Sequence, residues 1–414
     1  MVTFTTYFSV LSIIFIKVRI NVKWEQRKLS TLVTLHARIG WQNLRTSEFL
    51  DSGNYMLITG TDFNNGKIDY SKVHYVEKNR YDQDPKLQLH NGNILITKDG
   101  TIGKVAYVDR LKMPATLNAG IFNVTIKNKD ETNNKYLFNY LNAPFLMKYA
   151  TAESTGGTIK HLNQKVLVNF PVPISSIKEQ NKISNLLEII NKLLSLQQRK
   201  LKQLKQLKKA MLQQLFVDKN CKQPILRFKN FNDNWEERKL SDIANYRNGK
   251  AHEQYIDMNG IYTVVNSKFI STNGKVKKFS NKPIELLKKG EIAFVLSDVP
   301  NGKALAKTYL IDSDNKYSLN QRIAGITPSS DINSYFLYIL MNRNRYFLKF
   351  DDGVGQTNLS KKDIEEFKEN YPLFDEQQKI ANLFSKIQTL ITLRQDNLTQ
   401  LTTLKKYLLQ NLFI

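Results

Sequence analysis

The stretch EQNKISNLL at residues 179–187 returns as EQQKIANLF at residues 376–384, which is 197 residues later. Two further stretches recur with it. WEQRKLS at residues 24–30 returns as WEERKLS at residues 235–241, and LFV at residues 215–217 returns as LFI where the sequence ends. A duplicated unit of about 200 residues predicts two similar domains, each followed by the same kind of segment. Two such halves can diverge in sequence, so that each recognises a different half of a two-part target.

Each copy of the EQxKI stretch begins a long helical pattern. Apolar residues recur at alternating steps of three and four, which is the spacing of a coiled-coil seam. Because each helix carries one apolar stripe, we expect the two helices to cover each other. In this register Gln197 and Lys208 interrupt the first seam, and Arg394 and Lys405 interrupt the second at matching positions, although the seams can also be drawn differently near Leu207 and Leu404. The seam residues are Ile183, Leu187, Ile190, Leu194, Leu201, Leu204, Met211 and Leu215, and then Ile380, Phe384, Ile387, Ile391, Leu398, Leu401, Leu408 and Leu412.

The region before each helix mixes strand and helix signals. A turn leads into the apolar run ILIT at residues 94–97, and IAFV at residues 292–295 stands in the same place in the second copy. Helical patterns follow at residues 135–149 and 334–350. We therefore predict an α+β fold of mixed α/β character. Its expected parts are an atypical apolar leader (1–21), a first domain (22–175), a first long helix (176–217), a linker (218–234), a second domain (235–375) and a second long helix (376–414).

The charge balance favours a nucleic-acid partner. There are 61 Lys and Arg residues against 37 Asp and Glu, which gives a formal net charge of +24. Such an excess is typical of nucleic-acid binders, because neutralising phosphates supplies affinity before any base is read. A basic protein that only stays soluble would share this excess, as would one that binds a membrane surface. The spread of basic residues through both halves disfavours the membrane.

The first residues and the number of cysteines indicate where in the cell the protein is located. Residues 1–16 are apolar but short for a membrane-spanning helix, and they lack a positive leading region and a small-residue cleavage site. We interpret residues 1–21 as a replaced or truncated leader. The single cysteine, Cys221, excludes an intrachain disulfide and a cysteine cluster for zinc, and the five histidines form no metal-binding pair. These features predict a cytoplasmic protein without a bound metal.

Three catalytic motifs are absent from the sequence. None of the Gly-Lys pairs is followed by Ser or Thr, so there is no phosphate-binding P-loop. There is no Pro-Pro pair, which an amino-methyltransferase site requires for an extruded base. The Glu-x-Lys triplets at residues 237–239 and 366–368 lack the preceding Pro-Asp of a metal-dependent nuclease. The sequence therefore predicts a non-catalytic protein.

Over residues 22–414 the arrangement resembles the specificity subunit of type I restriction–modification systems. The lead-in PILRFKNF at residues 224–231 has no counterpart before Trp24, which is where the chain departs from the pattern. The resemblance rests on the order of several motifs: that lead-in followed by WEERKL at 235–240, the strand and turn at 92–104, the Gly-containing loops at 154–158 and 353–360, and FPVP at 170–173 before EQNKI at 179–183.

This resemblance implies two target-recognition domains, each reading one half of a split double-stranded DNA sequence. It implies that the two helices form an antiparallel coiled coil that sets the gap between the half-sites. Two methylation subunits, which carry S-adenosylmethionine, and two restriction subunits, which use ATP and Mg²⁺, are the expected partners. This chain itself is expected to bind no cofactor.

The turn after the buried strand and the Gly-containing loop are the expected DNA contacts in each copy. The loops precede helical segments, so they either offer backbone N–H groups to phosphate or form plain capped turns. We expect the helix starts to contact partner subunits, through Glu179, Gln180, Lys182, Glu376, Gln377 and Lys379. The DNA candidates are Lys98, Thr101, Lys104, Ser154, Thr155, Gly156, Gly157, Thr158 and Lys160, and then Ser297, Asn301, Lys303, Gly355, Gln356, Thr357 and Asn358.

Two other functions remain as alternatives at this point. A restriction or methylation enzyme that acts alone conflicts with the absent motifs. A coiled-coil adaptor for RNA or protein, with no sequence-specific role on DNA, is compatible with the charge and the helices. The purified chain discriminates between them, because a lone enzyme would methylate or cut DNA when given its cofactor.

Overall fold

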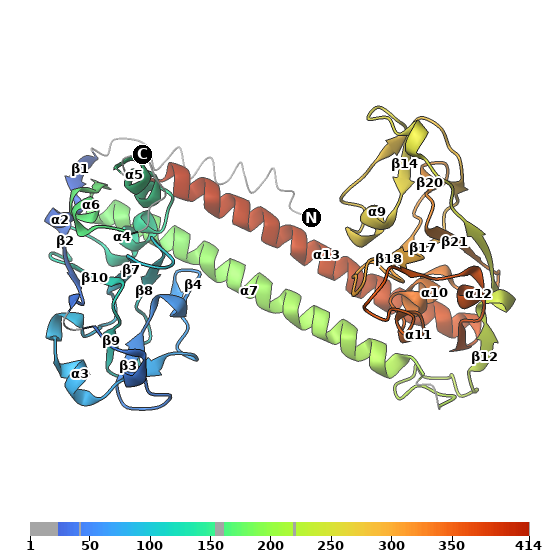
Figure 1. The fold of residues 1–414 in the computed structure, drawn as a ribbon, viewed down its shortest axis with the longest axis horizontal. Coiled ribbons are helices and arrows are strands. Elements are labelled where there is room, and N and C mark those ends of the chain that lie inside the picture. The colour runs from blue at the N-terminus through green and yellow to red at the C-terminus, as the bar shows by residue number, and fades with distance from the viewer. Residues whose placement is uncertain (1–23, 41–42, 154–160, 218–220, 414) are drawn as a thin grey trace. The chain divides into compact units, whose positions relative to one another are not determined.

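The computed structural model describes residues 24–40, 43–153, 161–217 and 221–413, so the leader lies outside it. The chain divides into a first unit, residues 1–198 with 397–414, and a second unit, residues 199–396. Figure 1 shows the ribbon of each unit. Among the described residues, no helix has the length and apolarity that crossing a membrane requires.

The first unit contains two main sheets. Its strands are β1 (Glu25–Lys28), β2 (Val33–Ala37), β3 (Met56–Ile58), β4 (Phe63–Asn64), β5 (Lys67–Ile68), β6 (His74–Tyr75), β7 (Ile94–Thr97), β8 (Val105–Tyr107), β9 (Ala115–Leu117), β10 (Ile121–Ile126) and β11 (Pro171–Ile174). One sheet is antiparallel with the order β2-β10-β7-β8. The other has the order β6-β3-β9, and β3 and β9 are parallel. Two short pairs, β1 with β11 and β4 with β5, complete the strands.

The second unit repeats the four-stranded antiparallel sheet of the first, but its second sheet has four strands instead of three. Its strands are β12 (Glu236–Lys239), β13 (Ala244–Asn248), β14 (Tyr262–Val265), β15 (Phe279–Ser280), β16 (Leu286–Leu287), β17 (Ile292–Val295), β18 (Ser297–Asp298), β19 (Thr308–Leu310), β20 (Tyr317–Leu319), β21 (Ile323–Pro328), β22 (Thr357–Asn358) and β23 (Lys368–Tyr371). The antiparallel sheet has the order β13-β21-β17-β19, and the second sheet, β15-β14-β20-β16, again contains one parallel pair, β14 with β20. Strand β12 pairs with β23 as β1 does with β11, and β18 forms a short pair with β22.

The apolar runs predicted at residues 94–97 and 292–295 are buried strands, β7 and β17. Successive side chains of a strand point to opposite faces, so one strand can serve two cores. Ile94 and Ile96 lie in the cluster that includes the helices, whereas Leu95 lies in the cluster of the second sheet. Strand β17 divides its side chains in the same way. Each unit is therefore built on one strand that joins two cores.

Short helices cover these sheets. The predicted helical patterns at 135–149 and 334–350 are helical, but each is two helices; Pro144 lies in the first break, and Asn344 caps the helix after the second. The short helices are α2 (Leu29–Leu32), α3 (Lys78–Asp82), α4 (Asn134–Leu141), α5 (Phe145–Glu153), α6 (Gln164–Asn169), α8 (Leu240–Ile243), α9 (Ser267–Ser271), α10 (Ser334–Met341), α11 (Arg345–Leu348) and α12 (Lys361–Glu365). Single 3₁₀ turns are η2 (Thr46–Glu48), η3 (Gly60–Asp62), η4 (Pro85–Leu87) and η5 (Glu253–Tyr255).

Two long helices, α7 (Ile177–Leu215) and α13 (Phe374–Asn411), follow the two sheet regions. In the first unit, Ile183 and Leu187 of α7 share an apolar cluster with Leu408 and Leu412 of α13. In the second unit, the end of α7 shares a cluster with the start of α13. The helices therefore pair antiparallel within each unit. Every predicted seam residue is buried or half-buried, which confirms the seam.

The repeated sequence motifs meet where each long helix begins. In the first unit, Gln180 Oε1 accepts a hydrogen bond from the backbone N–H of Asn133 at 2.9 Å. Its Nε2 donates to the carbonyl oxygens of Glu131 at 2.9 Å and Ser175 at 2.8 Å. The Glu131 side chain pairs with Arg27 of the WEQRKLS stretch at 3.0 Å. This network ties the helix to the strand β1 and to the loop before α4.

The second unit builds the same joint, with Asp331 in the place of Glu131 and Pro372 in the place of Ser175. Gln377 Oε1 accepts from the backbone N–H of Asn333 at 2.9 Å, and its Nε2 donates to the carbonyl oxygens of Asp331 at 3.3 Å and Pro372 at 2.9 Å. Asp331 pairs with Arg238 at 2.6 Å. The motifs recur in the sequence because they form this joint twice.

Burial lowers the pKa of Lys208, one of the two lysines that interrupt the seam. Because the folded state disfavours the charge, the ammonium costs stability wherever the unfolded chain would carry it, which includes neutral pH. We expect Lys208→Leu to stabilise the second unit by about 1 kcal/mol in chemical denaturation at neutral pH. The exposed Lys209→Leu is the matched control. A loss of stability in Lys208→Leu would show instead that the bond from Lys208 Nζ to Gln388 Oε1 at 2.8 Å outweighs the burial cost.

Candidate DNA interface

In the second unit, two loops that are distant in sequence lie against each other. Strands β18 and β22 pair antiparallel, with Ser297 opposite Asn358. The Gln356 side-chain amide donates to Ser297 Oγ at 2.7 Å and to Asn358 Oδ1 at 3.2 Å. Asn301 Nδ2 donates to the carbonyl oxygen of Gly353 at 3.4 Å. The structure thus brings together the predicted residues of both segments.

Asp298 fixes the shape of the first of these loops. Its Oδ2 accepts hydrogen bonds from the backbone N–H groups of Ala304 at 2.6 Å and Leu305 at 3.0 Å, and its Oδ1 accepts from Val299 at 2.9 Å. A Cβ atom at position 302 would lie 2.1 Å from Asp298 Oδ2, so the close approach requires Gly302. The exposed side chains on this loop therefore stand on a fixed backbone.

Two aspartates organise the second loop. Asp351 Oδ1 accepts from the backbone N–H of Gly353 at 3.1 Å, and Asp352 Oδ1 accepts from Val354 at 2.9 Å and Gly355 at 3.3 Å. The last two bonds hold the pKa of the Asp352 carboxyl below its ordinary value. These N–H groups have acceptors within the loop, which is the arrangement expected of a capped turn.

The predicted residues of these loops differ in exposure. Asn301, Lys303, Gly355, Gln356 and Asn358 are exposed. Ser297 and Thr357 are buried and act as internal partners, Thr357 Oγ1 donating to Asp351 Oδ1 at 3.4 Å. Two apolar side chains on the same loops are also exposed, Val299 by 64% and Val354 by 84%. Amide groups can hydrogen-bond base edges, and apolar groups can contact the thymine methyl, so the surface has the chemistry of base readout.

In the first unit, the turn after β7 carries Lys98, Thr101 and Lys104. Thr101 and Lys104 are exposed, whereas Lys98 is half-buried with its Nζ 5.7 Å from the centre of the Phe122 ring. A Cβ atom at position 103 would lie 2.0 Å from Met147 Sδ, so Gly103 lets α5 pack directly on the turn. The turn is thereby held against the helix that leads into the Gly-containing loop.

The first Gly-containing loop, with Ser154, Thr155, Gly156, Gly157, Thr158 and Lys160, lies outside the described residues. The residues that follow it do contact the turn after β7. The backbone N–H of Leu162 donates to the carbonyl oxygen of Lys98 at 2.9 Å, and His161 Nδ1 pairs with the Asp99 carboxylate. In both units, therefore, the chain beside the Gly-containing loop returns to the turn after the central strand.

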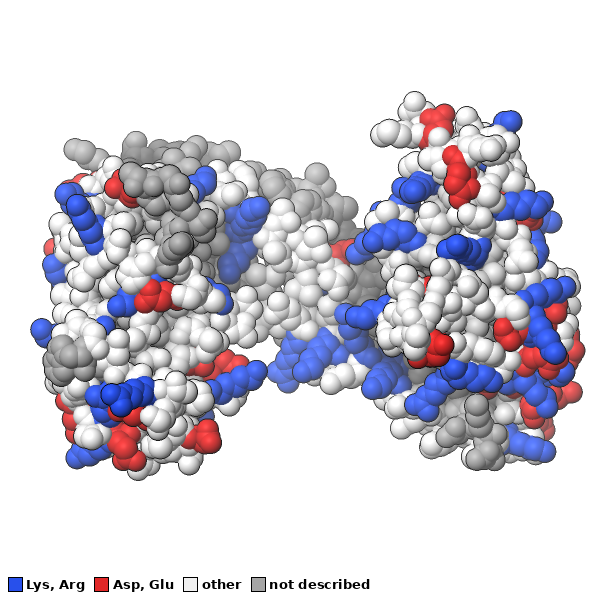
Figure 2. Space-filling model, viewed as in Figure 1, with Lys and Arg blue, Asp and Glu red and all other residues white. Residues whose placement is uncertain are grey.

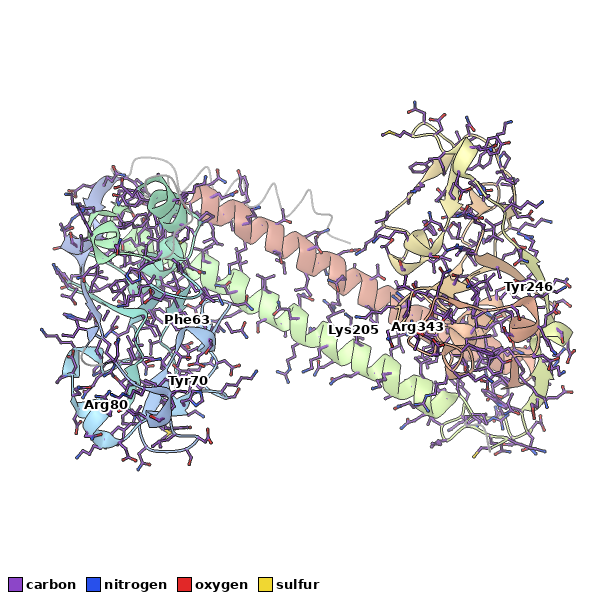
Figure 3. The ribbon with its side chains drawn as sticks, in the orientation of Figure 1. Phe63, Tyr70, Arg80, Lys205, Tyr246 and Arg343 are labelled. Atoms are coloured by element: carbon purple, nitrogen blue, oxygen red, sulfur yellow. The ribbon has the colours of Figure 1, made fainter. Side chains whose placement is uncertain are left out.

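Sequence reasoning missed the residues that brace these loops. Arg343 Nη1 donates to the carbonyl oxygens of Gly302 and Leu305, each at 3.4 Å, and its backbone N–H donates to Ala306 at 2.8 Å. Arg343 is labelled in Figure 3 among the side chains of the second unit. The run Asp351-Asp352-Gly353 carries a turn signal that was available in the sequence. Arg343 offers no such signal, because its acceptors are backbone carbonyls about 40 residues away.

Basic side chains are not confined to these loops. On the face shown in Figure 2, Lys and Arg side chains are spread over each unit, with smaller groups of Asp and Glu between them. Six further lysines of the second unit are exposed: Lys275, Lys277, Lys278, Lys282, Lys288 and Lys289. In the described part of the chain, no group of three or more His, Cys, Asp or Glu residues is arranged to hold a metal ion.

The predicted partner contacts at the helix starts are largely internal. Glu179, Gln180, Glu376 and Gln377 are buried, and the two glutamines form the joints described above. Only Lys182 and Lys379 of this set are exposed. Arg227, which sequence reasoning did not single out, pairs with Glu376 through two bonds of 2.9 and 2.8 Å.

Both halves of the chain match the model of the same protein family. The family model for the type I restriction modification DNA specificity domain covers residues 21–206 and again residues 232–403. The chain belongs to this family. Membership implies sequence specificity on DNA within a restriction–modification complex that contains further subunits.

Individual members of this specificity-domain family are similar to this chain along most of its length. The type I restriction enzyme MjaIX specificity subunit of Methanocaldococcus jannaschii is 25% identical over 338 residues, which are 76% of this chain and 74% of the relative. The crystal structure of a type I restriction–modification S subunit from M. genitalium is similar with a TM-score of 0.64 at 19% identity, covering 96% of this chain and 97% of that one. A chain from a structure on assembly of the type I system has a TM-score of 0.54 at 14% identity, covering 95% and 98%. These likenesses confirm the predicted fold of two tandem domains with long helices.

Proposed function

We propose that the chain is the non-catalytic, sequence-reading subunit of a type I restriction–modification complex in the cytoplasm, and that each unit reads one half of a split DNA target. The observation that carries this proposal is the joining of the two loops of the second unit into one surface of exposed amide and apolar side chains. The matching turn in the first unit and the net charge of +24 support it. Good base contacts contribute about 1–3 kcal/mol of discrimination each.

The paired helices give the proposal its geometry. Both α7 and α13 contribute residues to each unit, which supports the proposal that the length of the helices sets the gap between the half-sites. Methylation subunits with S-adenosylmethionine and restriction subunits with ATP and Mg²⁺, two of each, would assemble on this chain and perform the chemistry. A lone enzyme or a non-specific adaptor would lack the preference for a split duplex that we expect.

The exposed amides of the second unit provide the test. The double substitution Gln356→Ala with Asn358→Ala is expected to lower discrimination at one half-site about ten- to a hundredfold, because it removes amide contacts to base edges. Selection from a randomised duplex library, with the partner subunits present, measures both half-sites at once. Gln213→Ala, an exposed amide on α7, is the control. Equal loss at both half-sites, or no loss at either, would contradict the assignment of one unit to each half-site.

A further inference from the structure

In the second unit, the start of α13 holds a segment of the linker. Glu376 is 1% exposed and receives hydrogen bonds from Arg227 Nε and Nη2 at 2.9 and 2.8 Å. Lys379, one helical turn further on, lies 4.7 Å from the centre of the Phe231 ring. Phe231 follows Arg227 by four residues. The helix start therefore binds a guanidinium and an aromatic ring that are four positions apart.

The first unit has the same helix start, but its described residues include no segment that pairs with it in this way. Glu179 and Lys182 of α7 repeat Glu376 and Lys379. Glu179 is 7% exposed, and its Oε2 is buried with no hydrogen-bond partner among the described residues. Burial raises the pKa of its carboxyl, and the Ser175 side chain and then Lys182 offset part of that effect. A buried carboxylate without a cation is costly, and its counterpart in the second unit has one.

The sequence before Trp24 does not repeat the Arg-aromatic pair. When Trp24 is aligned with Trp235, Ile16 stands where Arg227 stands and Ile20 where Phe231 stands. A second copy of this chain is also a poor source of the arginine and the aromatic ring. Its residues 224–231 are already held by its own second unit through Arg227 and Phe231.

We propose that Glu179 and Lys182 form a binding site for an arginine and an aromatic residue four positions later, presented by a different protein. The guanidinium pairs with the Glu179 carboxylate in the bidentate manner of Arg227, and the ring stacks on the Lys182 ammonium as Phe231 does on Lys379. This site does not depend on DNA or on the proposed function. It would join the first unit to its partner at the base of the long helix.

The linker of this chain supplies the probe. A labelled peptide KQPILRFKNFND, the sequence of residues 222–233, is titrated with the full-length chain and its binding is followed by fluorescence anisotropy. We expect one peptide per chain, since the second unit holds its own segment at high effective concentration. Glu179→Gln in the protein, or Arg227→Ala in the peptide, is expected to weaken binding at least tenfold. Glu25→Gln, an exposed carboxylate of the first unit, is expected to leave it unchanged.

Folding and binding are separated by a second measurement. Glu179→Gln removes an unpartnered buried charge, so its thermal unfolding temperature is expected to equal or exceed that of the parent chain. The absence of peptide binding, or binding that Glu179→Gln leaves unchanged, would overturn the proposal. The leader contains one arginine, Arg19. Binding that appears only in the Arg19→Ala variant would also overturn the proposal, because the arginine would then come from this chain itself.

Discussion

Replacing Arg227 with methionine is expected to destabilise the second unit by about 3–5 kcal/mol, because it leaves Glu376 as a buried carboxylate without its cation. The two side chains are 14% and 1% exposed, and they share two hydrogen bonds of 2.9 and 2.8 Å. The carboxylate lies at the base of α13, next to the joint that Gln377 forms. The loss should lower the unfolding temperature of that unit by on the order of 10 °C.

Calorimetry of the full chain measures this effect, with a matched pair of controls. Arg227→Met with Glu376→Met removes both charges, and we expect most of the lost stability to return. Lys229→Met, an exposed cation in the same segment, should change the unfolding temperature by no more than about 2 °C. A double variant as unstable as Arg227→Met would show that packing by the arginine stem, not the ion pair, holds the segment.

Lengthening both long helices is expected to change the DNA target itself. The division between units falls after Gln198 in α7 and after Asp396 in α13, so insertions there preserve the contacts within each unit. Four residues add one helical turn of roughly 6 Å and one further step of four to each seam. With a rise of about 3.4 Å per base pair, the gap between half-sites should grow by one or two base pairs.

The methylated motif, read in cells that carry the lengthened chain and its partners, reports the gap directly. Insertion in α7 alone is the informative control, because unequal helices shift one seam against the other and should abolish recognition. The half-site sequences themselves should stay unchanged, since the loops are untouched. If the gap between half-sites stays unchanged when both helices are lengthened, the helices do not set that gap.

Several features of the fold follow from local sequence patterns. The alternating steps of three and four predict the buried seams of α7 and α13, and the run at residues 94–97 predicts a buried strand. The two-helix structure of residues 134–153 was also accessible, because Pro144 ends a helical pattern. What the pattern could not reveal is that β7 serves two cores, since that depends on a second sheet formed by distant segments.

The candidate site was predictable in part. The segments that carry Asn301 and Gln356 were predicted as separate DNA contacts, but their pairing through β18 and β22 joins residues about 60 positions apart and leaves no local trace. The helix starts were expected to contact partner subunits, and polar residues such as theirs are usually exposed. Gln180 is buried instead, because backbone groups of Glu131 and Ser175 satisfy its amide. Buried polar residues are hard to predict when their partners come from other loops.

The most direct test of the central claim is a map of adenine methylation across the genome, in cells that carry this chain with its partner subunits and in a matched strain that lacks only this chain. We predict a split motif, two short half-sites around a fixed gap, that is methylated only when the chain is present. Identical maps from the two strains, or a continuous motif without a gap, would contradict the reading of two half-sites by two units.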